Sequence, residues 1–185
     1  MMEVDLNRIK WYYMLNPLQS FLVTCVDRMG KPNIITLSYV YPISSNPSRV
    51  MIGIRPENYS HSLVDETKEF VVNTPTMELM RETEYCGRRS GRNFDKFKET
   101  GLTPLPAKEV KPPIIKECVA WIECKVQNQI DFGNRTLFFG DVVAAYVKDE
   151  IFQEKMYDIK KAKMIFHIGK NRYATLSDEV VQPKL

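Results

Sequence analysis

The chain has 185 residues, of which 44% are hydrophobic and 26% are charged, and its formal net charge is +3. This length suffices for one domain with a substantial buried core, and the composition excludes an intrinsically disordered chain. The small net charge disfavours general binding to a nucleic-acid backbone, because proteins that do so usually carry a strong basic excess on one face.

No apolar run approaches the roughly 20 residues of a membrane-spanning helix, and the N-terminus lacks the core of a signal peptide. The four cysteines, Cys25, Cys86, Cys118 and Cys124, include no C-x-x-C pair, and only two histidines are present, so no zinc-ligand spacing exists. We therefore expect reduced thiols in a cytoplasmic protein that binds neither membrane nor nucleic acid.

The first part of the chain alternates β-rich runs with breakers. Residues 20–26 (SFLVTCV) and 33–39 (NIITLSY) flank the polar turn DRMGKP and predict a hairpin. The stretch PISSNPS predicts a loop, and residues 49–54 (RVMIGI) predict a third strand.

A helix is predicted next, in the stretch NYSHSLVDETKE. Ser62 followed three residues later by Asp65 has the pattern of a capping box, and Ser60 is an alternative N-cap. Residues 70–75 (FVVNTP) then predict a buried strand that proline ends.

Residues 76–86 favour a helix by propensity and lead into the basic segment GRRSGR. Residues 93–101 predict a short helix closed by Gly101. Four prolines in residues 104–113 predict a connector. Residues 117–130 and 136–147 are β-rich and predict a second hairpin with long strands.

The C-terminal part predicts an amphipathic helix at residues 150–161 and a last strand at residues 163–169. Runs of strands, with helices grouped between two hairpins, predict a mainly β fold: an antiparallel barrel or sheet with helical insertions. A parallel doubly wound fold is disfavoured, because it needs a helix after nearly every strand.

Several chemistries lack their motifs in this sequence. The eight glycines form neither G-x-G-x-x-G nor a phosphate-binding loop of the G-x-x-x-x-G-K type, and no G-x-S-x-G elbow is present. Two histidines leave little room for a catalytic triad. Cofactor chemistry suits such a chain, because the reacting atoms then belong to the cofactor.

Five segments, taken in order, resemble the flavin reductase-like, FMN-binding split-barrel proteins, and within them the flavoredoxin-like branch. The segments are FLVTCVDRMGKPNIITLSY, MIGIRPENYSHSLV, EFVVNTP, GRRSGRNFDKF with TGL behind it, and ECKV followed by LFFGDVV. They cover residues 17–147. The resemblance implies one domain over residues 1–185, with residues 148–185 as an extension, and an antiparallel, Greek-key-like split β-barrel.

The resemblance also implies that FMN binds noncovalently at the barrel edge, usually in a homodimer. A strand edge then meets the isoalloxazine, a helix start meets the phosphate, and the basic segment wraps the phosphate or ribityl end. The helix start suits a phosphate because its N–H groups lack partners. The strand edge supplies Thr36, Leu37 and Ser38, the helix start Arg55, Ser60, His61 and Ser62, the following strand Asn73 and Thr74, and the basic segment Gly87, Ser90 and Lys96.

Taken without the resemblance, these residues have simpler explanations. Thr36 and Ser38 suit a solvent-facing strand side, Arg55 suits an exposed strand end, and the two helix serines suit caps alone. His167 is interpreted as a structural histidine. The cluster at residues 11–13 (WYY) suits a cover for the flavin ring, a dimer interface or plain core, and these alternatives stay open.

The resemblance implies an oxidoreductase that passes hydride from NADH or NADPH to the flavin, a step that needs no side-chain base. One alternative is an electron carrier that a partner protein reduces. A remote alternative is an oligonucleotide-binding barrel with residues 81–98 as its basic patch. Arg88, Arg89 and Arg92 exceed the needs of one phosphate, so we expect at least one to attract a nicotinamide nucleotide or an acidic partner.

Overall fold

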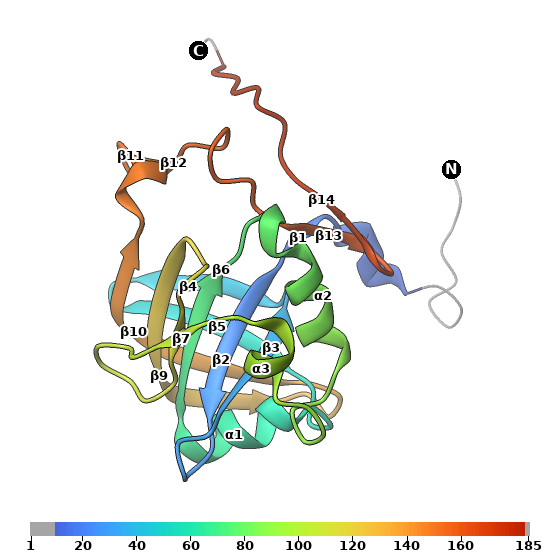
Figure 1. Ribbon diagram of the computed structural model, residues 1–185, viewed down its shortest axis with the longest axis vertical. Coiled ribbons are helices and arrows are strands. Elements are labelled where there is room, and N and C mark those ends of the chain that lie inside the picture. Colours follow the sequence, from blue (N-terminus) through green and yellow to red (C-terminus); the bar gives the residue numbers. More distant parts are fainter. Residues whose placement is uncertain (1–9, 184–185) are drawn as a thin grey trace.

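A seven-stranded antiparallel sheet forms the body of the protein in the computed structural model, which describes residues 10–183 (Figure 1). The helices are α1 (Tyr59–Thr67), α2 (Met80–Arg88) and α3 (Lys96–Thr100), with 3-10 helices at Trp11–Leu15, Met77–Leu79 and Asp149–Ile151. The strands are β1 (Leu18–Gln19), β2 (Phe21–Val26), β3 (Pro32–Leu37), β4 (Val40–Ser45), β5 (Ser48–Ile54), β6 (Glu69–Thr74), β7 (Pro104–Leu105), β8 (Ile114–Ile115), β9 (Ala120–Asp131), β10 (Thr136–Val147), β11 (Phe152–Gln153), β12 (Met156–Tyr157), β13 (Phe166–Gly169) and β14 (Arg172–Ala174).

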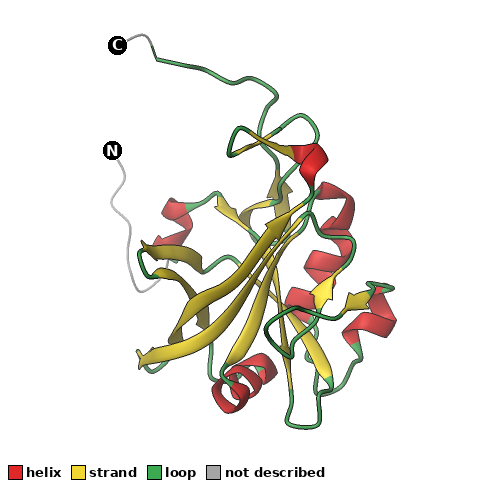
Figure 2. Ribbon diagram, turned by 90° about the vertical axis from the view of Figure 1, so that its left-hand side faces the viewer, coloured by secondary structure: helices red, strands yellow, loops and turns green. Residues whose placement is uncertain are grey.

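The main sheet has the strand order β3-β2-β6-β9-β10-β5-β4, and all neighbours are antiparallel. The sheet coils strongly, with α1 below it and α2 and α3 on one side (Figure 2). Among the described strands, β3 and β4 do not pair with each other, so the barrel stays open between them. This architecture confirms the predicted split barrel.

The apolar runs are continuous because several strands are buried on both faces. Val23 and Val72 point into the barrel, where α1 closes one end of the core. Their neighbours Leu22 and Val71 point outward, against α2, α3 and Trp121. Successive side chains of a strand face opposite sides of the sheet. Because both sides of these strands are buried in a core, apolar residues do not alternate with polar ones.

Both predicted hairpins are confirmed, as β2 with β3 and β9 with β10. The short helix α3 also matches its prediction: the Asp95 side chain accepts from the Lys98 N–H at the N-cap, and Gly101 ends the helix at φ 72°. Between Lys10 and Pro183, no helix is long and apolar enough to cross a membrane.

The predicted loop PISSNPS is wrong for its first half, because residues 40–45 form β4. Proline lacks a backbone N–H and is tolerated on an edge strand or at a bulge. Pro42 has both conditions, since β4 is the end strand of the sheet and its register with β5 shifts between Pro42 and Ser44.

The predicted helix at residues 150–161 is also wrong. A 3-10 turn leads into the hairpin of β11 and β12, whose two turn residues, Glu154 and Lys155, have φ values of 52° and 65°. Phe152 packs on Tyr157 across this hairpin, with ring centroids 5.1 Å apart. This cross-strand aromatic pair stabilises the hairpin, so the two side chains pack across strands and do not form the apolar face of a helix.

The predicted serine caps of α1 are wrong as well. The helix begins after Asn58, and no side chain caps it. Ser60 is buried inside the first turn, while the Ser62 hydroxyl donates to the Tyr59 carbonyl oxygen at 2.8 Å. A local bond of this kind competes with the capping geometry.

The buried carboxylate of Glu123 on β9 attaches the proline-rich connector to the sheet. It accepts from the backbone N–H groups of Lys108 at 2.8 Å and Glu109 at 2.7 Å, and from the Tyr146 hydroxyl at 2.6 Å. Burial raises the pKa of this carboxyl, but the hydrogen bonds outweigh burial and hold the pKa below its usual value.

Replacing Glu123 by Gln therefore lowers the free energy of unfolding by about 2 kcal/mol at neutral pH, because buried donors lose a charged acceptor. A lowered carboxyl pKa stabilises the fold above the ordinary glutamate pKa, and this stabilisation disappears as pH falls through the folded value. Urea unfolding at neutral and acid pH measures the difference, which shrinks in acid. Glu78→Gln, at an exposed position, is the control. An equal loss at both pH values contradicts the assignment.

Candidate active site

A cleft lies along β3, between the N-terminal segment, α2 and the C-terminal hairpin. It consists of two adjoining cavities of about 340 and 400 Å³ that share Thr36, Ser38, Arg55, Gly87 and His167. We call this continuous space the β3 cleft. It follows the edge of the open barrel, where β3 has no strand partner on its outer side among residues 10–183.

A smaller hollow of about 130 Å³ adjoins the β3 cleft at Asn58 and Arg88, and we call it the side pocket. The start of α1 and the segment after α2 line it, bringing Ser60, Ser90 and Lys96 together. The N–H groups of the first helical turn carry a partial positive charge at this point. The side pocket therefore suits an anionic group.

Two buried polar side chains hold donors at the side pocket. The Ser60 hydroxyl oxygen accepts from Asn33 Nδ2 at 2.7 Å, which leaves its own O–H to donate. Lys96 is only 4% exposed, and its ammonium donates to the Ile34 and Cys86 carbonyl oxygens at 2.7 Å each. An ammonium has three N–H groups, so one remains beyond these two bonds. Burial lowers the pKa of Lys96.

Glycine is needed where the basic segment passes the side pocket. A Cβ atom at Gly91 would lie 2.1 Å from Asn33 Oδ1 and 3.1 Å from Tyr59 Cδ1. No side chain fits there without moving Asn33, whose amide holds Ser60. The requirement for glycine is weaker at position 87, because an added Cβ atom would lie 3.3 Å from Thr36 Cβ. Glycine there still lets α2 approach the β3 edge closely.

One polar atom in the β3 cleft lacks a partner. Asn16 Nδ2 is buried and makes no hydrogen bond to any residue between 10 and 183. An unpaired buried donor is unfavourable unless a ligand or water accepts from it. Asn16 lines the cleft together with Thr36 and Ser38, so this N–H suits a carbonyl oxygen of a bound ligand.

Eight of the twelve residues predicted to bind cofactor line these two spaces. The β3 cleft and the side pocket together contain Thr36, Leu37, Ser38, Arg55, Ser60, Gly87, Ser90 and Lys96. Leu37 is mostly buried, and its side chain belongs to the barrel core. Thr36 donates its hydroxyl to the Thr83 carbonyl oxygen at 2.5 Å, which connects β3 to α2.

The other four predicted residues line neither space. His61 Nε2 lies 2.8 Å from Thr136 Oγ1, and its ring packs edge-on against Phe138. Ser62 is exposed. Asn73 is fully buried; its amide donates to the Leu22 carbonyl oxygen and accepts from the Ile115 N–H. Thr74 is buried at the end of β6. His61 and Asn73 therefore make contacts within the fold.

Sequence reasoning missed three cleft residues that come from distant segments. Arg135 follows the turn of the second hairpin, donates to the Gly53 carbonyl oxygen at 2.8 Å and lies 3.9 Å over the Tyr39 ring. His167, interpreted as structural, lines the cleft while its Nε2 contacts the Lys170 carbonyl oxygen at 2.8 Å. Asn16 has no local motif. Only the pairing of β10 with β5 and of β13 with β1 brings two of these segments to β3.

The three arginines of the basic segment have contacts of their own. Arg88 forms an ion pair with Glu84. Arg89 lies 5.4 Å over the Phe94 ring. Arg92 lies 5.3 Å over the Tyr59 ring and donates to the Glu57 carbonyl oxygen at 3.0 Å. Of the three, only Arg88 borders both the β3 cleft and the side pocket.

The open antiparallel barrel thus combines a cleft along its edge strand with a pocket at a helix start that suits an anionic group. Residues 14–167 match the flavin reductase like domain, and the chain belongs to the flavin reductase-like family. This match confirms the resemblance on which the predicted split barrel and cofactor class rested.

The relatives agree with this assignment. A protein of Archaeoglobus fulgidus is 35% identical over 179 residues, covering 96% of this chain and 97% of its own. A ferric-chelate reductase (NAD(P)H) of the same organism is 33% identical over 111 residues, 58% of this chain and 63% of its own. The structure of flavoredoxin from Desulfovibrio vulgaris (Miyazaki F) is similar with a TM-score of 0.84 and 27% identity, covering 98% of this chain and 97% of that one.

The residues present fit flavin mononucleotide. The side pocket offers the Ser60 hydroxyl, the Lys96 ammonium and a helix start for a phosphate. The β3 cleft offers a strand edge and the unpartnered Asn16 amide for the polar side of a flavin ring.

Two serines of α1 provide a matched test of this geometry. Ser60→Ala raises the dissociation constant for FMN about tenfold, because one charge-assisted hydrogen bond to the phosphate is lost. Ser62→Ala changes it by less than about twofold, because that hydroxyl is outside both spaces. Quenching of flavin fluorescence on titration with the apoprotein measures both constants. Equal effects of the two substitutions contradict the placement of the phosphate.

Proposed function

We propose that this protein binds FMN noncovalently in the β3 cleft and transfers hydride from a nicotinamide nucleotide to it. The observation that carries the proposal is the continuity of the β3 cleft with the side pocket. A long groove is thereby joined to a buried hydroxyl and ammonium at its end. Family membership supports the flavin, and similarity to a ferric-chelate reductase (NAD(P)H) supports the donor.

In this proposal the chain positions the cofactor and supplies charge. Bound FMN supplies the hydride-accepting chemistry. Thr36 and Ser38 would line one side of the ring, and Asn16 would hold it with its unpartnered N–H. Arg55 and Arg135 border the cleft, where positive charge stabilises the negative charge that reduction adds. The transfer needs no side-chain base, which suits a cleft whose one histidine, His167, already contacts a carbonyl oxygen.

A second candidate is an electron carrier without its own nicotinamide site. The similarity to flavoredoxin over nearly the whole chain favours this alternative. Both candidates share the flavin and differ in the source of electrons, so one experiment separates them.

The absorption spectrum of freshly purified protein, read again after denaturation, is expected to show one FMN per chain. Under anaerobic conditions NADH or NADPH bleaches the bound flavin in the first candidate. Bleaching by dithionite but by neither nucleotide favours the carrier. Free FMN mixed with the same nucleotides is the control. A colourless protein that fails to bind added FMN overturns the proposal.

We also propose that the chain forms a homodimer. An apolar groove of about 880 Å³ borders the β3 cleft through Tyr12, Tyr39, Arg55 and Arg135. The exposed side chains of Trp11, Leu15, Tyr41 and Phe132 line it. Apolar surface of this kind usually marks an interface. The position of the groove at the edge of the proposed cofactor site supports a second copy of the chain as the partner that covers it.

We propose the cytoplasm as the location of the protein. The four buried free cysteines support a reducing compartment of this kind.

Phe132→Glu is expected to convert the dimer to a monomer, because a charge at an apolar interface is desolvated without a partner. Phe132 is 64% exposed, so the fold of the single chain does not depend on its side chain. Light scattering coupled to gel filtration measures the mass. Met29→Glu, at a position 91% exposed on the turn before β3, keeps the mass of two chains and serves as the control. A monomeric wild-type protein contradicts the proposal.

A further inference from the structure

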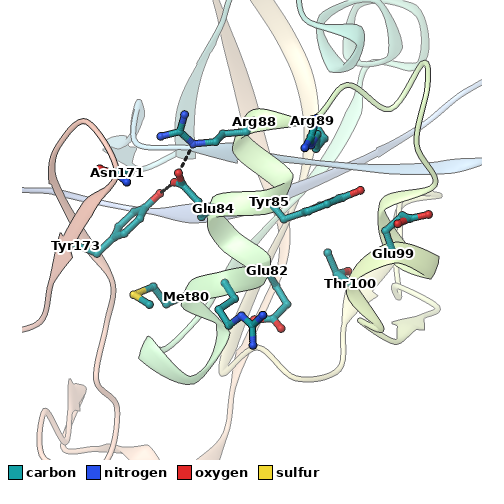
Figure 3. A pocket seen from close by; sticks show the side chains of 11 residues that line it. Met80, Glu82, Glu84, Tyr85, Arg88, Arg89, Glu99, Thr100, Asn171 and Tyr173 are labelled. Carbon is teal, nitrogen blue, oxygen red and sulfur yellow. Dashed lines mark hydrogen bonds and ion pairs between the residues drawn. The ribbon is translucent and has the colours of Figure 1, made fainter.

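A separate cavity of about 670 Å³ lies on the outward face of α2, and we call it the α2 trough (Figure 3). The helix forms its floor. Asn171 and Tyr173 of the C-terminal hairpin form one wall, and Glu99 and Thr100 of α3 form the other. The site described above does not use this space.

The α2 trough adjoins the β3 cleft through three shared residues, Glu84, Arg88 and Tyr173. Glu84 accepts from the Arg88 guanidinium and from the Tyr173 hydroxyl, and both bonds are drawn in Figure 3. Arg88 therefore has a carboxylate partner already, and this network forms the border between the two spaces. A ligand long enough to cross it occupies both.

The trough contains an acceptor that lacks a donor. Glu82 Oε2 is buried, and no residue within the described part of the chain donates to it. A buried carboxylate oxygen without a partner is costly, so the position suits a ligand that presents hydroxyl or amino groups. Glu82 is one of the residues that line the trough, so its carboxylate lies at the wall of this cavity.

The remaining lining is mixed in charge. Three arginines, Arg81, Arg88 and Arg89, face three glutamates, Glu82, Glu84 and Glu99. A strongly acidic protein partner would place its carboxylates against these glutamates, and a hollow fits a small molecule better than a protein surface. A nucleotide suits the mixture, because it has anionic phosphates, ribose hydroxyl donors and a flat base. Tyr85 offers an aromatic ring for that base, and Figure 3 shows the ring beside Arg89.

We propose that the α2 trough binds the adenosine diphosphate half of the nicotinamide nucleotide whose reduced ring enters the β3 cleft. The inference rests on the proposed function for the identity of the donor. Arg89 pairs with the pyrophosphate, Glu82 accepts from the ribose hydroxyls, and Tyr85 stacks on the adenine. The nicotinamide end crosses the Glu84 network to reach the flavin.

Reduced nicotinamide mononucleotide, which lacks the adenylate half, tests this directly. The FMN-loaded protein is expected to use NADH with a kcat/KM at least about 50-fold higher than that for the mononucleotide. Arg89→Ala and Glu82→Ala each lower kcat/KM for NADH about tenfold, and neither changes kcat/KM for the mononucleotide more than about twofold. General damage to the flavin site lowers both values together, which contradicts the inference.

Lys98→Ala is the matched control, because Lys98 is an exposed cation on α3 that does not line the trough. It leaves both values of kcat/KM unchanged. A loss equal to that of Arg89→Ala assigns the effect to general electrostatic attraction and overturns the site. Repeating the comparison at high salt adds a check, since long-range attraction is screened and a specific pair less so.

Binding of ADP to the oxidised, FMN-loaded protein, measured by calorimetry, gives a readout without turnover. We expect saturable binding that Arg89→Ala and Glu82→Ala weaken about tenfold and Lys98→Ala leaves unchanged. If neither NADH nor NADPH reduces the flavin, the proposal of a nicotinamide nucleotide as electron donor is wrong, and ADP binding still tests whether the α2 trough is a nucleotide site. If NADH and the mononucleotide react equally and ADP does not bind, the assignment of the α2 trough as a nucleotide site is wrong, while the proposed function stands.

Discussion

The open edge of β3 is the constraint on which the rest of the structure depends. On one side β3 pairs with β2 over its whole length, and on the other it has no strand partner within the described residues. An unpaired strand edge is normally covered or charged, because it invites pairing with other chains. Here α2, the N-terminal segment and the C-terminal hairpin surround the edge without pairing with it, and the space between them is the cleft.

The edge stays in place because the sheet behind it is packed on both faces. Cores on the two sides of β2 and β6 hold β3 from within the barrel and from outside it. The bond from the Thr36 hydroxyl to the Thr83 carbonyl oxygen and the absence of a side chain at Gly87 then fix how closely α2 approaches. This packing sets the width of the cleft, which helps to position a ligand.

Much of this arrangement could be predicted from local sequence, and the reason is physical. The hairpins depend on β-rich runs and turn residues that are close in the chain, so local pattern suffices. The two wrong elements have different reasons. Pro42 is tolerated in a strand because that strand is the end strand of the sheet, and this position cannot be seen in a short window of sequence. Residues 152–157 form a local hairpin in which Phe152 packs on Tyr157, and the helical period of the apolar residues masked this pairing.

The same distinction separates the site residues. Motif order brought Thr36, Ser60 and Lys96 into the prediction, and the structure places all three at the cleft or the side pocket. The motif SHS could not tell Ser60 from Ser62, because the two differ only in which side of the first helical turn they occupy. Helix geometry separates neighbours two positions apart by more than half a turn, so one is buried against Asn33 and the other faces water.

The C-terminal extension contributes to the site although the sheet does not include it. β13 pairs with β1 and β14, in a separate small sheet that holds His167 and Tyr173 beside α2. Burial raises the pKa of the Glu84 carboxyl, but the bonds from Tyr173 and Arg88 outweigh burial and hold it below its usual value. The carboxylate therefore stays charged at neutral pH and keeps the hairpin attached to α2. One ionised group thus fixes the shared wall of the β3 cleft and the α2 trough, so the geometry of each space depends on the other.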